Sequence, residues 1–457
     1  MKLGLFGLLV TLLFALSGAP AMAKSDASVS PSAGARTISL EEAYDMALAT
    51  DQAIRIAYWE VRKANLLPWS ALTRLGPSVT GSAGYNRNGN TTILPTRNKG
   101  GTRTDFDTFE SHSGAGFGSM SFDQPLIDLT VFPAYKLGKI SAEVARLEHQ
   151  FTIRETLFGV ATAYFEVLKQ QRLVVVNQLT FQLSNEQLTL AQKRANAGEV
   201  TPTDILRAQV TLETARQALV AAENTLELDR NTLGNILNLP VDTKFDVSEP
   251  QDYPTEVPAF SSLLQRAYDH REDLRVKILG IDQDTQRKNQ VIAEYGPRVV
   301  LQGSTEISND TGSSRSNSRT WSAGISVQVP FLTGGQREID LITARHQIEE
   351  SKLARDQTMK TVESDAKQAW LTVRTLEVTL KASKVQVEAA EQAYKDLQAQ
   401  YAASSATSVD VLSGLNDLNN ARKNLAQQTY DYQVALRNLE QVSGVFQEKR
   451  VSKTKVR

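Results

Sequence analysis

Cysteine is absent from the 457-residue sequence, so neither a disulfide framework nor a lipidated cysteine is available. A protein of this size can do without disulfides when its helices and strands are long and well packed. Long apolar runs are scarce as well. After residue 23, no run approaches the roughly 18 residues that a membrane-spanning helix needs. The sequence therefore predicts no membrane helix beyond that point.

An excess of charge of one sign is also missing, because 50 Lys and Arg oppose 51 Asp and Glu for a net charge of −1. This balance argues against nucleic acid as a partner and against a polybasic membrane tether. The four histidines are scattered without metal-ligand spacing. No glycine-rich phosphate loop follows a predicted strand, and no catalytic constellation is present. The sequence predicts a protein that is not an enzyme and that uses no cofactor or metal.

The first 23 residues have the pattern of a secretory signal peptide. Lys2 precedes an apolar run from Leu3 to Leu16, and Ala21-Met22-Ala23 supplies a small-residue cleavage site. We expect residues 1–23 to be removed on export and residues 24–38 to form a flexible N-terminal segment.

What the chain does contain is an internal two-fold repeat. Gly76-Pro77 recurs as Gly296-Pro297, 220 residues later, and Thr201-Pro202-Thr203-Asp204 recurs as Thr407-Ser408-Val409-Asp410, at an offset of 206. Such repeats commonly build a symmetric object. We expect a first repeat over residues 39–240, a linker or small side structure over 241–260, a second repeat over 261–446 and a disordered basic tail over 447–457.

Each repeat is predicted to contain one helix, two strands and a long helical hairpin. The opening helices start at Ser39 and at Ser261 or Ser262, and both end at the Gly-Pro pair. The long helix of the first repeat is expected from Ser141 to about Ala197. Its partner carries leucines at strict sevens, which is typical of a coiled-coil seam; these are Leu212, Leu219, Leu226 and Leu233.

The predicted strands alternate apolar and polar residues over about ten positions. The clearest run places Trp321, Ala323, Ile325 and Val327 on one face. The polar stretches 86–111 and 309–318 are interpreted as exposed loops. The alternation fits both a soluble sandwich and a membrane barrel. Four strands cannot close a barrel, because the smallest membrane barrels have about eight, so a membrane sheet would have to be shared by several chains.

Taken together, the motifs resemble the TolC-like outer-membrane efflux proteins of Gram-negative bacteria. The resemblance runs from Ser39 to about Phe446, and the residues that carry it include Ser39-Leu40-Glu41-Glu42-Ala43, Gln124-Pro125-Leu126, Ala163-Tyr164-Phe165, Ala197-Gly198, Arg271-Glu272-Asp273-Leu274-Arg275 and Asp410-Val411-Leu412. It implies a mixed α and β fold, in which a homotrimer builds a long α-helical coiled-coil barrel and a 12-stranded membrane β-barrel with four strands per chain.

The same resemblance implies an export duct in the outer membrane of a Gram-negative bacterium that extends into the periplasm. Such a duct serves a tripartite efflux pump or a type I secretion system. Its partners are outer-membrane lipid, a periplasmic adaptor protein and an inner-membrane transporter, which chooses the cargo. Two alternatives are a trimeric coiled-coil adhesin or stalk and a periplasmic adaptor without a channel. They fit less well, because the strands are internal and the helical hairpin occurs twice.

Two groups of residues are predicted to act in the duct. Thr201-x-x-Asp204 and Thr407-x-x-Asp410 have the spacing of helix capping boxes. The resemblance also assigns Asp410 to an acidic ring at the periplasmic constriction, and Asp204 and Tyr401 to hydrogen bonds between neighbouring hairpins. The tip of the second hairpin lacks the glycine and basic residue that are usual there. On the strands, the residues expected to face lipid are Met120, Phe122, Trp321, Ile325 and Val327.

Overall fold

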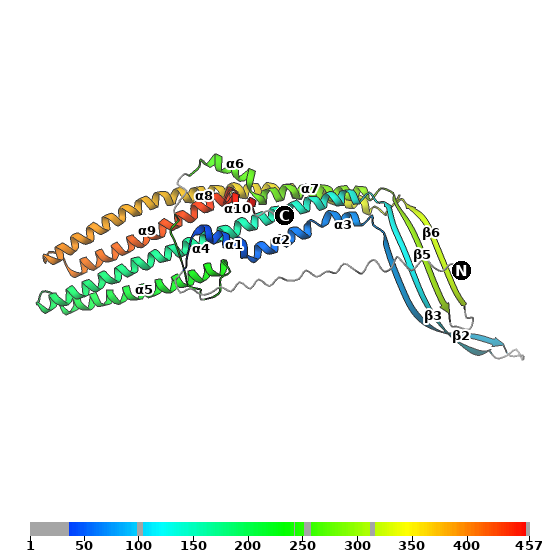
Figure 1. Cartoon of the computed structure of the whole chain (residues 1–457), viewed down its shortest axis with the longest axis horizontal. Helices are drawn as coiled ribbons and strands as arrows, with labels where there is room; N and C mark the ends of the chain where they lie inside the picture. Colours follow the sequence, from blue (N-terminus) through cyan, green and yellow to red (C-terminus); the bar gives the residue numbers. More distant parts are fainter. Residues whose placement is uncertain (1–35, 98–103, 242, 251–256, 311–315, 454–457) are drawn as a thin grey trace. The chain divides into compact units, whose positions relative to one another are not determined.

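The computed structural model describes residues 36–97, 104–241, 243–250, 257–310 and 316–453. The predicted signal peptide and most of the segment 24–38 lie outside these residues. The described chain is mostly helical with one four-stranded sheet and one small two-stranded sheet (Figure 1). This agrees with the predicted mixture of α and β structure.

The opening helix of each repeat is interrupted, which corrects the sequence prediction. The first repeat begins with α1 (Leu40–Thr50), α2 (Gln52–Ala64) and α3 (Leu67–Thr73). Asp51 adopts an extended conformation, and its carboxylate accepts a hydrogen bond from the Ile54 amide at 2.9 Å. It thereby ends α1 and caps α2. The second repeat begins at Phe260, with α6 (Phe260–His270) and α7 (Glu272–Ala293).

The strands are longer than predicted. They are β2 (Ser78–Arg97), β3 (Thr104–Ile127), β5 (Arg298–Asp310) and β6 (Ser316–Gln328), and their order in the sheet is β2-β3-β5-β6 with every pair antiparallel. Most of the predicted loop 86–111 is therefore a continuous β2–β3 ladder. Its Asn, Thr and Ser side chains are exposed, so the stretch never shows the apolar alternation that marks a half-buried strand.

Two long helical hairpins follow the strand pairs. The first consists of α4 (Val131–Asn196) and α5 (Pro202–Ile236), and the second of α8 (Gln336–Ala402) and α9 (Ser408–Val442). Helix α4 begins ten residues before the predicted start at Ser141. Pro133 is tolerated there because an amide in the first helical turn needs no partner within the helix. At 1.5 Å per residue, α4 and α8 are each about 100 Å long.

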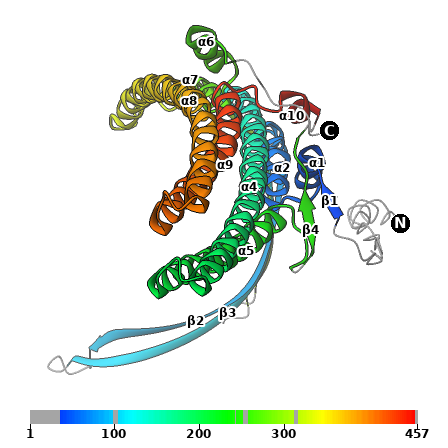
Figure 2. The same cartoon turned by 90° about the vertical axis from the view of Figure 1, so that its left-hand side faces the viewer.

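The long helices are arranged side by side in a single curved layer, with α6 and α10 outside it (Figure 2). Toward the hairpin turns, α4 packs against α9, so α5 and α8 are the outer helices. Toward the sheet, α7 lies between α4 and α8, and α2 and α3 pack on the other side of α4. The layer thus has two open sides, formed by α8 on one and by α5, α2 and α3 on the other. None of the described helices has the length and hydrophobicity that a membrane crossing requires.

The segment between the repeats contains a small strand, and the start of the C-terminal tail is more ordered than predicted. Strand β4 (Phe245–Val247), in the predicted linker, pairs with β1 (Arg36–Ile38). The start of the predicted disordered tail forms α10 (Glu448–Lys453), and Arg450 makes ion pairs with Glu41 and Asp45. Phe446 and Val451 are buried in the main core, which α1 and α4 dominate. These segments fold because they cover apolar surface on α1 and α4, which their own sequence does not reveal.

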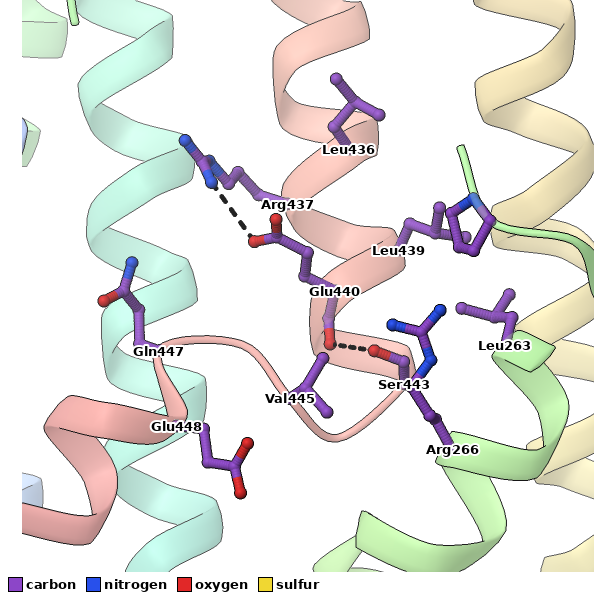
Figure 3. A pocket seen from close by; sticks show the side chains of 11 residues that line it. Leu263, Arg266, Leu436, Arg437, Leu439, Glu440, Ser443, Val445, Gln447 and Glu448 are labelled. Carbon is purple, nitrogen blue, oxygen red and sulfur yellow. Dashed lines mark hydrogen bonds and ion pairs between the residues drawn. The ribbon is translucent and has the colours of Figure 1, made fainter. Parts of the chain in front are cut away.

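A cavity of about 480 Å³ lies between α6, the end of α9 and α10 (Figure 3). Leu263 and Leu439 lie on its apolar side, and the Arg437 guanidinium is paired with Glu440 at 3.3 Å. Nearby, the Arg154 guanidinium donates to Glu272 at 2.6 Å and to the Phe446 carbonyl, also at 2.6 Å. This buried ion pair joins α4, α7 and the chain that leaves α9, and so fastens the two halves of the chain together.

Candidate functional site

The first candidate site is the apolar face of the four-stranded sheet. The strand register places Met120 and Trp321 in one row across the sheet, because each is aligned with Thr305. Phe122 is aligned with Gly303, two residues along the same face. Ile325 and Val327 continue this face on β6, opposite Leu301 and Val299. All five residues predicted to face lipid therefore lie on one face, where Trp321 is 80% exposed.

The other face of the sheet is lined by small hydroxyl side chains. Three pairs bond across neighbouring strands, at 2.7 Å for Ser82–Ser119, 2.8 Å for Ser304–Ser322 and 2.7 Å for Ser308–Ser318. The hydroxyls satisfy one another and also suit contact with water. The sheet is thus amphipathic, with an exposed apolar face and a polar face. Strands β2 and β6 form its two open edges.

The second candidate site comprises the turns of the two helical hairpins. The α4–α5 turn has Gly198 at φ +75°, and the α8–α9 turn has Ser404 at φ +62°. In each, the next amide bonds back to a helical carbonyl at 2.9 Å, from Glu199 to Arg194 and from Ser405 to Gln400. Both turns are therefore Schellman-type helix ends. Ser404 in the second turn bears a steric cost in this left-handed conformation, which Gly198 in the first turn avoids because it has no Cβ.

Both predicted capping boxes are present at the starts of α5 and α9. The Asp204 carboxylate accepts from the Thr201 amide at 3.0 Å, and the Asp410 carboxylate accepts from the Thr407 amide at 2.9 Å. Hydrogen bonds from the Ser408 and Thr201 hydroxyls lower the pKa of Asp204 below its ordinary value. The Thr407 hydroxyl and amide do the same for the pKa of Asp410. Both aspartates are therefore carboxylates at neutral pH, and Asp410 is exposed.

Tyr401 and Asp204 lie at the same end of the helical layer without bonding to each other in this chain. The ring of Tyr401 is buried, with only 5% of the residue exposed, and its hydroxyl has no hydrogen-bond partner in the described part of the chain. Asp204 instead accepts a hydrogen bond from Ser408 at the start of α9. The role of Ser408 was not predicted from the sequence, because its hydrogen bond joins residues 204 positions apart.

Arg194 is a second residue at the hairpin turns whose role was not predicted from the sequence. Its guanidinium lies over the Tyr401 ring at 4.4 Å and donates to the Tyr401 carbonyl at 2.5 Å and to the Ser404 hydroxyl at 2.7 Å. It also pairs with Glu199 at 2.8 Å. The first hairpin thus supplies a basic residue to the turn of the second, where the sequence has none. Seven residues earlier on both helices, the Gln187 side-chain amide on α4 donates to the Tyr394 hydroxyl on α8 at 3.1 Å.

A sequence signal for this contact exists in retrospect. Gln187 and Arg194 are seven residues apart on α4, and Tyr394 and Tyr401 are seven apart on α8. Residues at this spacing recur on one helix face, so two matching pairs indicate two helices in register. Metal binding has no comparable support: within the described ranges, no three His, Asp or Glu side chains are placed to hold an ion.

Comparison with known proteins places this arrangement in a family. The family described as Outer membrane efflux protein matches residues 43–239 and 263–445. The proteases secretion protein PrtF of Dickeya chrysanthemi is 22% identical over 91% of this chain and 90% of its own length. The outer membrane protein TolC of Escherichia coli is 24% identical over 74% of this chain and 71% of its own length.

Solved structures show the same fold. The outer membrane protein VceC of Vibrio cholerae superposes with a TM-score of 0.68 at 17% identity, covering 89% of this chain and 96% of its own. The Campylobacter jejuni CmeC outer membrane channel gives 0.69 at 15% identity, with 91% and 89% covered. The family match favours a channel over an adhesin or an adaptor, and the family is one of channels rather than an enzyme class. The chain belongs to the outer membrane efflux protein family and is a TolC-like efflux or secretion channel of the Gram-negative outer membrane.

Proposed function

We propose that the chain is the export duct of a tripartite efflux pump or a type I secretion system. Three copies form a 12-stranded barrel in the outer membrane, with four strands from each, and a 12-helix tunnel in the periplasm. An adaptor protein and an inner-membrane transporter deliver the cargo to it. The observation that carries this proposal is a four-stranded sheet with one exposed apolar face and two open edges.

The direction of the strands supports closure by several copies. Each strand is antiparallel to its neighbour, so β2 and β6 at the two edges run in opposite directions. β6 of one copy can therefore pair with β2 of the next in the same antiparallel way. Open edges cannot persist in lipid, and membrane barrels need about eight strands or more. Two copies reach that minimum, and three give the 12 strands of the proposed trimer.

The helical layer supports the same assembly. Large apolar side chains are exposed along the helices at its two open sides, namely Ile56, Trp59 and Trp69 on α2 and α3, Leu206, Val210 and Leu228 on α5, and Leu353, Val378 and Val385 on α8. Exposed apolar rows of this length mark a surface that another protein covers. In the proposed ring, one open side of each copy packs against the opposite side of the next. The recurrence of the hairpin-turn sequence at an offset of 206 supports two repeats that each supply a sixth of the proposed ring.

The hairpin turns form the proposed periplasmic gate. Three exposed Asp410 carboxylates around the axis would make an acidic ring that favours cations. The Tyr401 hydroxyl has no partner in the described part of the chain and is buried there, so the proposed bond to Asp204 of another copy requires the Tyr401 ring to turn outward on assembly. Arg194 and Ser408 add the bonds that hold the two turns of one copy together. The gate would thus be latched both within and between copies.

Native mass spectrometry of the detergent-purified protein tests the assembly, and a stable folded monomer would overturn it. The lipid-facing face is tested by two neighbouring substitutions on β6. Ile325→Arg places a charge in hydrocarbon and should cost roughly 2–4 kcal/mol per copy near the bilayer midplane. Ser326→Arg on the polar face should cost much less and change conductance instead. Equal loss of trimer stability in the two variants would show that the faces are assigned wrongly.

A further inference from the structure

The β2–β3 ladder continues well past the other two strands of the sheet (Figure 1). Asn86 and Ala115 form the last pair that also has a partner on β5. Beyond it, among the residues that the structure describes, β2 and β3 pair only with each other, as far as Arg97 and Thr104. At about 3.3 Å per residue, this ribbon reaches roughly 35 Å. A lone two-stranded ribbon is marginally stable in water, so one of this length calls for a partner.

Both faces at the end of the ribbon carry exposed large apolar side chains, and Asp107, aligned with Leu94, is the charged residue between them on one face. Ile93 and Phe106 are diagonal neighbours on one face, and Leu94 and Phe109 are diagonal neighbours on the other. All four side chains are at least half exposed. Diagonal aliphatic–aromatic pairs stabilise a ribbon, but here both pairs leave large apolar area in contact with solvent. The end of the ribbon therefore offers two apolar surfaces, back to back.

Hydrocarbon is not what covers these surfaces. A membrane strand needs about 9–11 residues, which the paired region of β5 and β6 already provides. Ile93 lies seven residues beyond Asn86, which is roughly 23 Å farther along the strand. The intervening ribbon is polar and charged, with Arg87, Asn88, Asn90 and Glu110 among its exposed residues. An added strand is also disfavoured, because Pro95 on the outer strand β2 has no amide to donate.

We propose that the ends of the β2–β3 ribbons from three copies pack on one another as a cap over the extracellular mouth of the channel. This inference rests on the proposed trimer. A 12-stranded barrel with strands about 4.8 Å apart and tilted by about 40° has a radius of roughly 12 Å, so ribbons of roughly 35 Å reach its axis. A two-stranded ribbon twists strongly, so its end can turn its faces from the outside and inside of the barrel toward the two neighbouring copies. In a three-fold ring, one face then meets one neighbour and the opposite face meets the other. The Ile93–Phe106 face of one ribbon then meets the Leu94–Phe109 face of the next, and both apolar faces are buried.

Cysteine cross-linking tests the contact directly, because the chain has no cysteine of its own. In the double variant Phe106→Cys, Phe109→Cys, the two thiols lie on opposite faces of one strand and are too far apart to bridge within a chain. Oxidation in outer-membrane vesicles should convert most of the chain to covalent dimers and trimers on a non-reducing gel. Asn88→Cys, Thr91→Cys is the matched control, with the same spacing nearer the base of the ribbon, and it should stay monomeric on the gel.

A channel recording tests whether the contact closes the mouth. Oxidation of the Phe106→Cys, Phe109→Cys variant in planar bilayers should lower its conductance, and a reductant should restore it. A monomeric band for this variant, in a protein that native mass spectrometry finds trimeric, would overturn the cap and leave the proposed function intact. Equal cross-linking of the control, or unchanged conductance on oxidation, would overturn it as well. A protein that is not trimeric would overturn the proposed function and the cap together.

Discussion

The two hairpin turns have the same local construction but differ in what holds them. Each has a left-handed residue, at Gly198 or Ser404, followed by a capping box at the next helix start. Arg194, at the first turn, donates a hydrogen bond to Ser404 in the second turn. Ser408, at the second turn, donates a hydrogen bond to Asp204 at the first. In the described part of the chain, the Asp410 carboxylate accepts hydrogen bonds from Thr407 alone. Local sequence thus sets the shape of each turn, whereas contacts between hairpins set how firmly it is held.

Loss of Arg194 should have the largest effect on this difference. Arg194→Ala removes charged hydrogen bonds and a cation–π contact, together on the order of 2–4 kcal/mol. Hydrogen exchange should increase strongly over residues 400–412 and only slightly over 198–206, and basal conductance in planar bilayers should rise. Lys193→Ala is the control, because Lys193 is exposed and its substitution removes the same charge from the neighbouring position. Equal effects from the two variants would mean that only the charge matters.

Replacing the two capping aspartates should have the next largest effect, and the effect should differ between the two turns. Asp204→Asn and Asp410→Asn each weaken a helix cap, which is worth about 0.5–2 kcal/mol. Asp204→Asn also weakens the bond from Ser408, so its turn should lose more protection in hydrogen exchange. Asp410→Asn should instead reduce cation selectivity, measured as the reversal potential in a salt gradient. If both variants lose protection equally and neither alters selectivity, the turns are equivalent and the acidic ring is absent.

Tyr401→Phe should have a smaller effect that depends on assembly. In the described part of one chain the Tyr401 hydroxyl is buried without a partner, so its removal should leave the turn as protected as before. In the proposed trimer, the proposed bond to Asp204 of another copy would be lost, at about 0.5–1.5 kcal/mol, or up to roughly 3 for a charged acceptor. Basal conductance should rise while protection within each hairpin is unchanged. Unchanged conductance would place the latch elsewhere.

Acid should loosen both caps, and this is the smallest expected effect. The pKa of each aspartate is lowered in the folded protein, so its contribution to stability is complete above the ordinary aspartate value of about 3.9. It is lost as the pH falls from there through the lower folded pKa. Conductance should therefore increase as the pH is lowered below about 4. The double variant Asp204→Asn, Asp410→Asn should lack this step, and a step of equal size in it would implicate other groups.

The elements that the sequence predicted well are those with regular patterns. The heptad leucines mark α5, where Leu226 and Leu233 are buried as a packed seam requires. The alternation in β6 marks an amphipathic strand, and the capping boxes mark the starts of α5 and α9. Such patterns are periodic, so a few residues suffice to identify them. The ribbon beyond Asn86 was missed because a strand exposed on both faces has no period to detect.

The sequence by itself determined the secondary structure of the periodic segments, the two capping boxes and the shared face of Met120, Phe122, Trp321, Ile325 and Val327, since each follows from spacings of a few residues. The tertiary structure alone decided the folding of α10 onto α1 and the contacts of Arg194 and Ser408. These depend on which surfaces meet across hundreds of residues. A side chain at such a meeting point carries no local signal, because its partner is supplied by packing rather than by neighbours in the chain.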